Sequence, residues 1–106
     1  MPTKVVRTFL YAEIQVSIPF EKIDWESINV AMKQEPGLKS KTWLSGINNN
    51  TIGGFYEFDS LENARAYATG YLAAAAQQIG GSLSVKLFDA DVTAAASAAI
   101  ASPFYR

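Results

Sequence analysis

QEPGLKSKTWLSGINNNTIGGFYEF, residues 34–58, contains in order the end of a helix, a turn and two strands of a predicted hairpin. Glu35-Pro36-Gly37 ends the helix, because proline moves its predecessor out of helical geometry and glycine accepts the conformations of a chain reversal. Asn48-Asn49-Asn50 is a turn signal, since asparagine tolerates a left-handed backbone. Residues 52–58 are therefore predicted to return antiparallel to the strand before the turn.

The strand before this turn has two unlike faces. At a period of two, one face carries Lys39, Lys41, Trp43 and Ser45. The other face carries Leu38, Ser40, Thr42 and Leu44. One face is thus amphipathic and aromatic, and the other is mildly apolar.

Composition limits the classes of protein to which the chain can belong. At 106 residues and 49% hydrophobic content, residues 1–106 are predicted to form a single domain with one core. The formal net charge of −1 comes from 9 basic and 10 acidic side chains. We expect no binding to nucleic acid and none to a membrane surface, and we expect a small apolar or aromatic molecule as partner.

The chain contains neither cysteine nor histidine. Disulfides, thiolate nucleophiles, an imidazole base, zinc sites of the usual ligand type and a proximal haem histidine are therefore excluded. We predict no metal site and no cofactor. The sequence shows no signal-peptide pattern and no membrane-spanning apolar run, so a cytoplasmic location is expected.

Outside the hairpin, hydrophobic periodicity predicts two strands and three helices. The strands are residues 5–17 and Ser82–Asp89; the helices are Glu21–Gln34, a second one capped by Asp59 or Ser60 and ended by Gly80-Gly81, and a short one within Val92–Ala101. Their order is strand, helix, strand, strand, helix, strand, followed by the short helix.

Four local features carry further predictions. Glu62 follows Asp59 by three residues, as in a capping box. Gly70 lies inside the second helix and is predicted to pack closely against the sheet. Gly53-Gly54 is predicted to form a strand bulge rather than a phosphate loop. The apolar arc of the first helix is wide, so this helix is pressed from two sides or lines a cavity or subunit contact.

This order of elements predicts an α+β fold of the ferredoxin-like βαββαβ type, an antiparallel four-stranded sheet with the helices on one face. The other face would be bare and would include aromatic side chains. We therefore predict a two-fold homodimer. The C-terminal helix and tail, residues 92–106, carry Phe104 and Tyr105 and are expected to pack on the body of the protein or on the partner subunit.

Five motifs give the chain a resemblance to a known family. They are Gln34-Glu35-Pro36-Gly37, Lys41-x-Trp43, Gly53-Gly54-x-Tyr56-x-Phe58, Ala64-x-x-Tyr67 and Lys86-x-Phe88-Asp89. In order and spacing this set resembles the YdhR-type monooxygenase family of the dimeric α+β barrel superfamily. The resemblance spans roughly residues 9 to 92 and leaves out the alanine-rich tail.

The resemblance implies a homodimer of ferredoxin-like protomers and an oxygenase activity on aromatic, often polyketide-derived, substrates without metal or flavin. The same barrel also serves haem degraders, isomerases and binding proteins. The family pattern can place a histidine near the position that Glu13 occupies in this chain.

Three side chains are the candidate catalytic residues. Glu13 is either one half of an ion pair with Lys86 or Arg7 across the dimer interior, or a general base whose pKa is raised by burial. Trp43 either packs or uses its indole N–H to orient a substrate carbonyl. Tyr56 places its hydroxyl in a pocket or at the surface. The candidate ligand-binding residues are Arg7, Tyr11, Trp25, Lys41, Tyr67 and Lys86.

Three functions follow from these residues. The first is a cofactor-independent monooxygenase with an apolar pocket between sheet and helices, in which the protein supplies desolvation, orientation and hydrogen bonds to developing oxyanion charge. The second is a non-catalytic binding or accessory protein, favoured by the absence of histidine and cysteine. The third is an isomerase or cyclase that uses the same pocket without consuming oxygen.

Overall fold

Four antiparallel strands form one sheet in the computed structural model, which describes residues 6–105. The strands are β1 (Thr8–Gln15), β2 (Leu38–Ser45), β3 (Thr51–Phe58) and β4 (Ser82–Asp89). Their order across the sheet is β2-β3-β1-β4, so β1 lies between β3 and β4. The α+β class and the ferredoxin-like βαββαβ order are confirmed.

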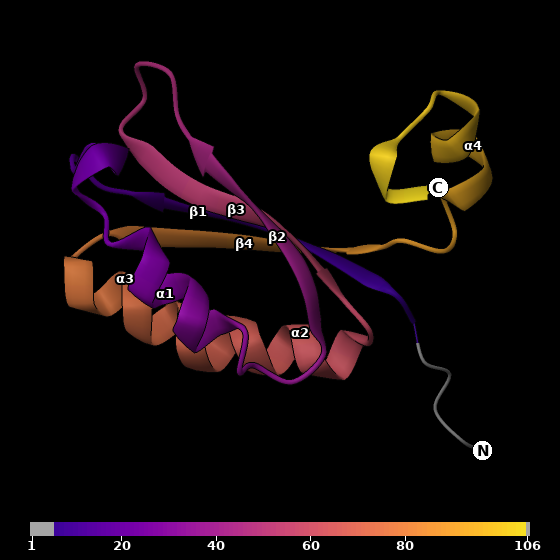
Figure 1. The fold of residues 1–106 in the computed structure, drawn as a ribbon, viewed down its shortest axis with the longest axis horizontal. Helices are drawn as coiled ribbons and strands as arrows, with labels where there is room; N and C mark the ends of the chain where they lie inside the picture. The colour runs from indigo at the N-terminus through magenta and orange to yellow at the C-terminus, as the bar shows by residue number, and fades with distance from the viewer. Residues whose placement is uncertain (1–5, 106) are drawn as a thin grey trace.

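Three helices cover one face of this sheet, and a fourth lies on its other side (Figure 1). The first three are α1 (Trp25–Met32), α2 (Leu61–Tyr67) and α3 (Ala73–Ile79). The fourth, α4 (Ala94–Ala99), follows β4 and lies beyond the end of that strand. The sheet face turned away from α1, α2 and α3 is thus partly covered by the C-terminal part of the chain.

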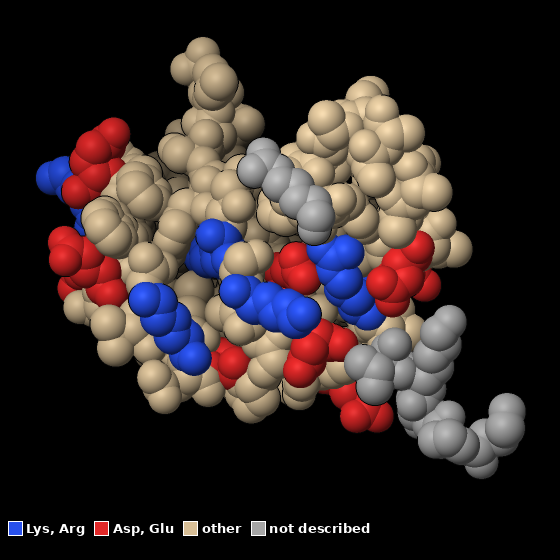
Figure 2. All heavy atoms as spheres, turned by 45° about the vertical axis from the view of Figure 1, so that its right-hand side comes forward, with Lys and Arg blue, Asp and Glu red and all other residues tan. Residues whose placement is uncertain are grey.

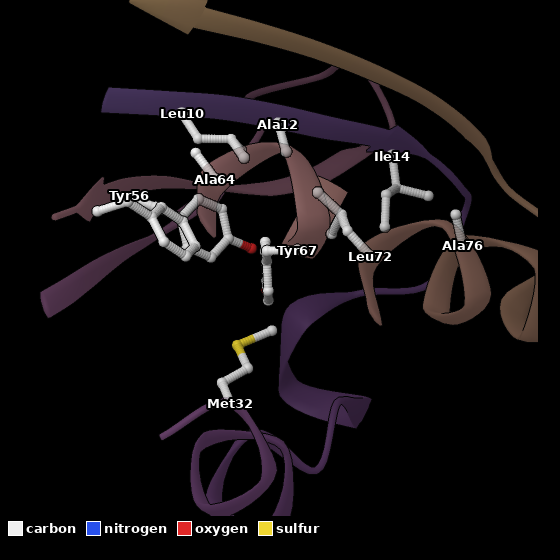
Figure 3. Packing of buried hydrophobic residues seen from close by; sticks show 10 residues of the cluster. Leu10, Ala12, Ile14, Met32, Tyr56, Ala64, Tyr67, Leu72 and Ala76 are labelled. Carbon is white, nitrogen blue, oxygen red and sulfur yellow. The ribbon is translucent and has the colours of Figure 1, made fainter. Parts of the chain in front are cut away.

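The first strand is shorter than its predicted range of residues 5–17, and Val5 lies outside the described residues. Its two-sided pattern is confirmed, because Leu10, Ala12 and Ile14 are buried while Gln15 is exposed. Figure 3 shows these three side chains projecting from β1 toward Leu72 and Tyr67 of the helical layer. The core of the protein therefore lies between the sheet and α1 to α3.

The first helix is also shorter than its predicted range of 21–34. A 3-10 turn, η1, covers Phe20–Lys22, and the chain is extended at Ile23 before α1 begins. Asp24 Oδ1 accepts a hydrogen bond from the Ser27 backbone N–H at 3.3 Å, so this side chain caps the helix. The predicted helix is therefore divided into two segments, η1 and α1, and Asp24 is the N-cap of the second.

The cap of the second helix is Ser60, whose Oγ accepts a hydrogen bond from the Asn63 backbone N–H at 3.1 Å. Asp59 Oδ1 instead accepts a hydrogen bond from the Asn63 side chain at 2.8 Å. The capping box predicted from Asp59 and Glu62 is therefore wrong by one position. The predicted end of this helical stretch is confirmed, because Gly80 adopts a left-handed φ of 72°.

Between α2 and α3 the helix widens into a π-helical turn, η2 (Ala68–Leu72). Gly70 lies in this turn, and a Cβ placed on it would meet no atom within 4 Å. The predicted close packing of Gly70 against the sheet is wrong, since Gly70 faces away from it into open space. The widened turn brings Tyr67 and Leu72, five residues apart, to the same buried side.

A bulge lies in β2 rather than at the two glycines of β3. The register of β2 against β3 shifts between Leu38 and Ser40. Leu38 therefore packs against the core on the same face as Lys41 and Trp43, which corrects its predicted place on the opposite face.

Gly53 and Gly54 pair in regular register with both neighbouring strands, so the predicted bulge at these residues is wrong. A Cβ at Gly53 would lie 2.0 Å from the carbonyl oxygen of Ala12. A Cβ at Gly54 would lie 2.7 Å from Lys41 Cε and 3.0 Å from the Tyr56 ring. The glycine at 54 leaves room for these two side chains on the helix-covered face.

The C-terminal tail packs against the opposite face of the same chain. The Phe104 ring lies 5.1 Å from that of Phe55 and 5.6 Å from that of Phe9, between ring centroids. The Tyr105 hydroxyl donates a hydrogen bond to the carbonyl oxygen of Ala90. Of the two placements left open by the sequence, these contacts are with the body of the protein; a contact with a partner subunit stays a prediction.

Candidate functional site

A cavity of about 160 Å³ lies between the sheet and the helices and opens toward solvent on one side. The sheet contributes residues from three of its four strands, β1, β2 and β3, and the helical layer closes the cavity on the opposite side. The lining from the sheet is Ala12, Ile14, Lys41, Trp43, Ile52, Gly53 and Tyr56; that from the helical layer is Ile23, Ile28, Met32, Tyr71, Leu72, Ala75, Gln78 and Ile79. The wall is mostly apolar, with one amine and two phenols as its main polar groups.

Lys41 is the basic side chain of this cavity. Its Nζ lies 3.2 Å from the centroid of the Trp43 ring and 4.9 Å from that of Tyr56. The same Nζ is 3.5 Å from the sulfur of Met32. None of the described residues that line the cavity is a carboxylate.

Burial lowers the pKa of Lys41 to about 7. The face of the Trp43 ring attracts the ammonium form and works in the opposite direction. Near neutral pH this amine is thus divided between its charged and neutral forms. A neutral amine can accept a proton or attack an electrophile.

Trp43 is held in place by a hydrogen bond from its indole Nε1–H to Asn29 Oδ1 of α1, at 3.0 Å. Its ring also contacts Phe20 of η1, with 5.6 Å between centroids. The sequence left open whether Trp43 packs or uses its indole N–H to orient a substrate. In the structure this N–H is already bonded to Asn29, and Trp43 presents its ring face to the Lys41 amine at the cavity.

Tyr56 and Tyr67 form a buried aromatic pair with 5.1 Å between ring centroids. Burial raises the pKa of Tyr56 to about 12 and raises that of Tyr67 as well. Tyr56 lines the cavity, whereas Tyr67 lies behind it and stacks on Tyr71 at 5.6 Å. Within the described part of the chain, the Tyr67 hydroxyl has no hydrogen-bond partner. Both phenols stay protonated at neutral pH, so each carries an O–H that can donate a hydrogen bond.

Glu13 and Tyr11 lie on the opposite face of the sheet. The Tyr11 hydroxyl donates a hydrogen bond to Glu13 Oε2 at 3.3 Å, and burial raises the pKa of Tyr11. Lys86 pairs with Tyr11 across β1 and β4 and is exposed. The sheet therefore separates Glu13 from the cavity that contains Trp43 and Tyr56.

Arg7 belongs to the same face as Glu13, but its partner is Glu57. Its Nε and Nη2 donate to the two carboxylate oxygens of Glu57 at 2.9 and 3.2 Å. Nη2 also donates to the carbonyl oxygen of Phe104, and the guanidinium lies 4.7 Å from the centroid of the Tyr105 ring. The hydrogen bond with Glu57 raises the pKa of Arg7. Within this chain Arg7 thus pairs with Glu57, and an ion pair of Glu13 with Lys86 or Arg7 across a dimer interior stays a prediction.

Trp25 lies at the first position of α1 with 44% of its surface exposed, and it does not line this cavity. Next to the cavity lies an outer groove of about 230 Å³ between α1 and β2, which Trp25 does not line either. Met32, Lys41 and Trp43 line both the cavity and the outer groove. These three side chains form the wall between the cavity and the outer surface.

Sequence reasoning did not single out Asn29, Met32 or Tyr71. Met32 and Asn29 belong to the wide apolar arc of the first helix, whose predicted alternative of lining a cavity is the one that the structure shows. An asparagine within such an arc, three residues before a methionine, is the signal that could have indicated a polar partner for an aromatic N–H.

Charged groups are mixed over the surface shown in Figure 2, with no field of one sign. Residues 6–105 contain no cluster of three or more potential metal-ligating Asp or Glu side chains. In the same residues, the helices are all too short or too polar to cross a membrane.

Residues 9–101 match the family model described as "Putative mono-oxygenase ydhR". The match extends beyond residue 92, where the motif set ends, and includes the alanine-rich segment. No curated protein matches the chain.

Proposed function

The chain belongs to the ydhR family, whose description is putative mono-oxygenase, and from that premise we propose that it oxygenates a small aromatic substrate in the cavity between sheet and helices. The substrate would be phenolic or anthrone-like, of the polyketide type, and the reaction would use neither metal nor flavin. The observation that carries this proposal is the half-buried Lys41 side chain, whose amine lies in an apolar cavity and has no carboxylate partner among residues 6–105.

The proposed reaction begins with the transfer of a proton from the substrate to the neutral amine of Lys41. The substrate anion, surrounded by apolar walls, then gives its electrons directly to dioxygen, and a carbon–oxygen bond forms. The resulting peroxide takes the proton back and loses water, which leaves a carbonyl group on the substrate carbon that carried two hydrogens. One oxygen atom of dioxygen enters the product, the other leaves as water, and all the electrons come from the substrate.

Two features of the cavity support this chemistry. The Tyr56 hydroxyl, protonated at neutral pH because its pKa is raised, is available as a donor toward oxyanion charge. The volume of about 160 Å³ matches one aromatic ring, and the open side leaves the rest of a larger molecule outside. The Lys41 ammonium that forms would be attracted to both the substrate anion and the Trp43 ring.

The proposal is tested by oxygen uptake with anthrone and hydroquinone substrates, with metals chelated and no flavin added. We expect uptake that rises with pH through about 7, where Lys41 becomes neutral. Lys41→Met should reduce the rate by about 10²-fold or more. Lys39→Arg, a change two residues away at an exposed position, is the matched control.

Failure of the folded protein to consume oxygen with any of these substrates would contradict the proposal. A rate unchanged in Lys41→Met but lost in Glu13→Gln would instead place the base on the opposite face of the sheet. Ligand binding without turnover would favour an accessory binding role on the same scaffold.

We also propose that the protein is a homodimer through the sheet face turned away from α1, α2 and α3. The exposed Phe88 and half-buried Phe55 and Tyr11 lie on this face, and the C-terminal tail covers only one end of it. Pairing two such faces would bury apolar area and polar groups such as Glu13 and Lys86 between subunits. Sedimentation at micromolar concentration should give twice the monomer mass of 11.5 kDa; a folded monomer would contradict this proposal.

A further inference from the structure

Lys41 is unlike the other lysines among the described residues. Lys22, Lys33, Lys39 and Lys86 are exposed, whereas Lys41 is largely withdrawn from solvent and lines a cavity. Lys41 pairs with Tyr56 across the two strands, and its stem runs diagonally over Gly54, where the missing side chain leaves room for it. The position of the amine in the cavity is therefore built into both strands.

The atoms around this amine are mostly uncharged. Trp43, Tyr56 and Met32 contact it or face it through an aromatic ring or a sulfur atom. Its hydrogen bonds do not include a carboxylate or a backbone carbonyl within residues 6–105. The lone pair of the neutral amine is thus not engaged by a strong donor.

Four titratable groups face Lys41 from the elements packed around it. Tyr56 of β3 and Tyr71 of η2 lie across the cavity, and both have a raised pKa, so they are neutral at pH 7. Lys33 after α1 and Lys39 of β2 line the outer groove, and neither carries a negative charge that would hold the Lys41 ammonium. Each of these neighbours leaves the neutral form of Lys41 accessible near pH 7.

We propose that Lys41 condenses reversibly with a small aromatic aldehyde in the cavity and holds it as an imine. The apolar wall would take the ring, and the amine at the wall would reach the carbonyl carbon. A single-ring aldehyde is the class that the volume of about 160 Å³ accepts.

The step balances without an oxidant or reductant. The nitrogen lone pair forms a bond to the carbonyl carbon, and the electrons of the carbonyl double bond move to oxygen, which takes one hydrogen from nitrogen. Loss of the carbon–oxygen bond then forms the carbon–nitrogen double bond, and the second amine hydrogen leaves with that oxygen as water. Desolvated lysines in apolar pockets carry out this reaction with carbonyl compounds.

This inference does not depend on the oxygenase proposal, because imine formation consumes no oxygen. The folded protein is incubated under argon at pH 7 with benzaldehyde and sodium cyanoborohydride, which reduces an imine to a stable secondary amine. Peptide mass spectrometry then gives the labelling rate of each lysine. We expect Lys41 to react on the order of tenfold faster than Lys39, since an amine with a pKa of about 7 is about half neutral and an ordinary lysine is almost entirely charged.

Two controls locate the reaction. Toluene, a single-ring compound that competes for the cavity, should slow labelling of Lys41 and leave Lys39 unchanged. Unfolding in guanidinium should remove the preference. Because the comparison is made within the wild-type chain, no variant has to fold. Equal rates at Lys41 and Lys39, a preference that survives unfolding, or a Lys41 rate unaffected by toluene would each overturn the inference.

Discussion

Each face of the sheet holds one basic side chain in a protected position, Arg7 on one face and Lys41 on the other. Polar and charged groups bind Arg7, whereas uncharged groups surround the Lys41 amine. Arg7 is bound by both oxygens of Glu57, a backbone carbonyl and the rings of the C-terminal tail, and its pKa is raised. Lys41 has a sulfur atom and aromatic faces around it, and its pKa is lowered. A paired cation of this kind stabilises a fold, whereas an unpaired one becomes available for chemistry.

The first way to test this difference is to truncate two neighbouring residues of β1 that point to opposite faces. Leu10→Ala should lower the free energy of unfolding by about 2–5 kcal/mol, because Leu10 is fully buried among the helices. Tyr11→Ala should cost about 1 kcal/mol, because Tyr11 is only half buried in one chain. Urea unfolding measures both. If Tyr11→Ala lowered the free energy of unfolding as much as Leu10→Ala does, Tyr11 could not be half-buried in solution. That result would indicate that its sheet face is covered, as in the proposed dimer.

Removal of the paired cation should affect stability and leave the cavity unchanged. Arg7→Met should lower the free energy of unfolding by about 1–3 kcal/mol, since the half-buried Glu57 loses its hydrogen-bond partner and the tail loses an anchor at Phe104. Denaturant unfolding gives the loss, and proteolysis should cut the C-terminal tail faster. Labelling of Lys41 serves as the control. A loss of Lys41 reactivity in this variant would break the comparison.

The unpaired cation should make stability depend on pH. The folded chain releases the Lys41 proton near pH 7 and the unfolded chain near pH 10.5, so in between the unfolded chain binds more protons. The free energy of unfolding should therefore rise with pH by about 1 kcal/mol per unit above pH 7, relative to Lys41→Met. Urea titrations of both proteins between pH 7 and about 9 measure this slope. Parallel curves for the two proteins would show that Lys41 keeps an ordinary pKa.

The smallest effect concerns two glycines of the helical layer. Gly70→Ala should raise the free energy of unfolding by about 0.5–1 kcal/mol, because a Cβ there meets nothing and restricts the unfolded chain. Gly80→Ala should lower it by about 1 kcal/mol, since Gly80 has a φ of 72°. Thermal unfolding of the two variants compares them directly. A destabilised Gly70→Ala would mean that the π-helical turn requires glycine.

Much of this architecture could be predicted from the periodicity of the sequence. The strand Ser82–Asp89 was predicted to the residue, and the hairpin follows from Asn48 and Asn50, which adopt the left-handed φ values of 57° and 52°. Some local signals allow two equivalent solutions. Asp59 and Ser60 are both good N-caps, so the sequence left the choice open, and only the path of the chain into α2 decides for Ser60 and against the capping box built on Asp59.

The site was less predictable, because a period of two does not say which face will be covered. Glu13 and Trp43 could meet only if both faced the same side, and they do not, because Glu13 pairs with Gly53 and Trp43 pairs with Gly54, the next residue of β3. The importance of Lys41 depends on an absence, since no carboxylate among the described residues bonds to it. That property belongs to the packing of α1, β2 and β3 together and is not visible in any single stretch of sequence.

The π-helical turn between α2 and α3 implies that this part of the chain tolerates shortening by one residue better than the α-helices on either side of it. Deleting Gly70 would return the turn to ordinary α-helical winding, in which Tyr67 and Leu72 would be four positions apart and still on one face. Leu72 and Ala76 would then stay against the sheet, and Ala75 would stay at the cavity. Among relatives of this protein, one-residue gaps in alignments should therefore fall within residues 68–72 more often than within α2 or α3.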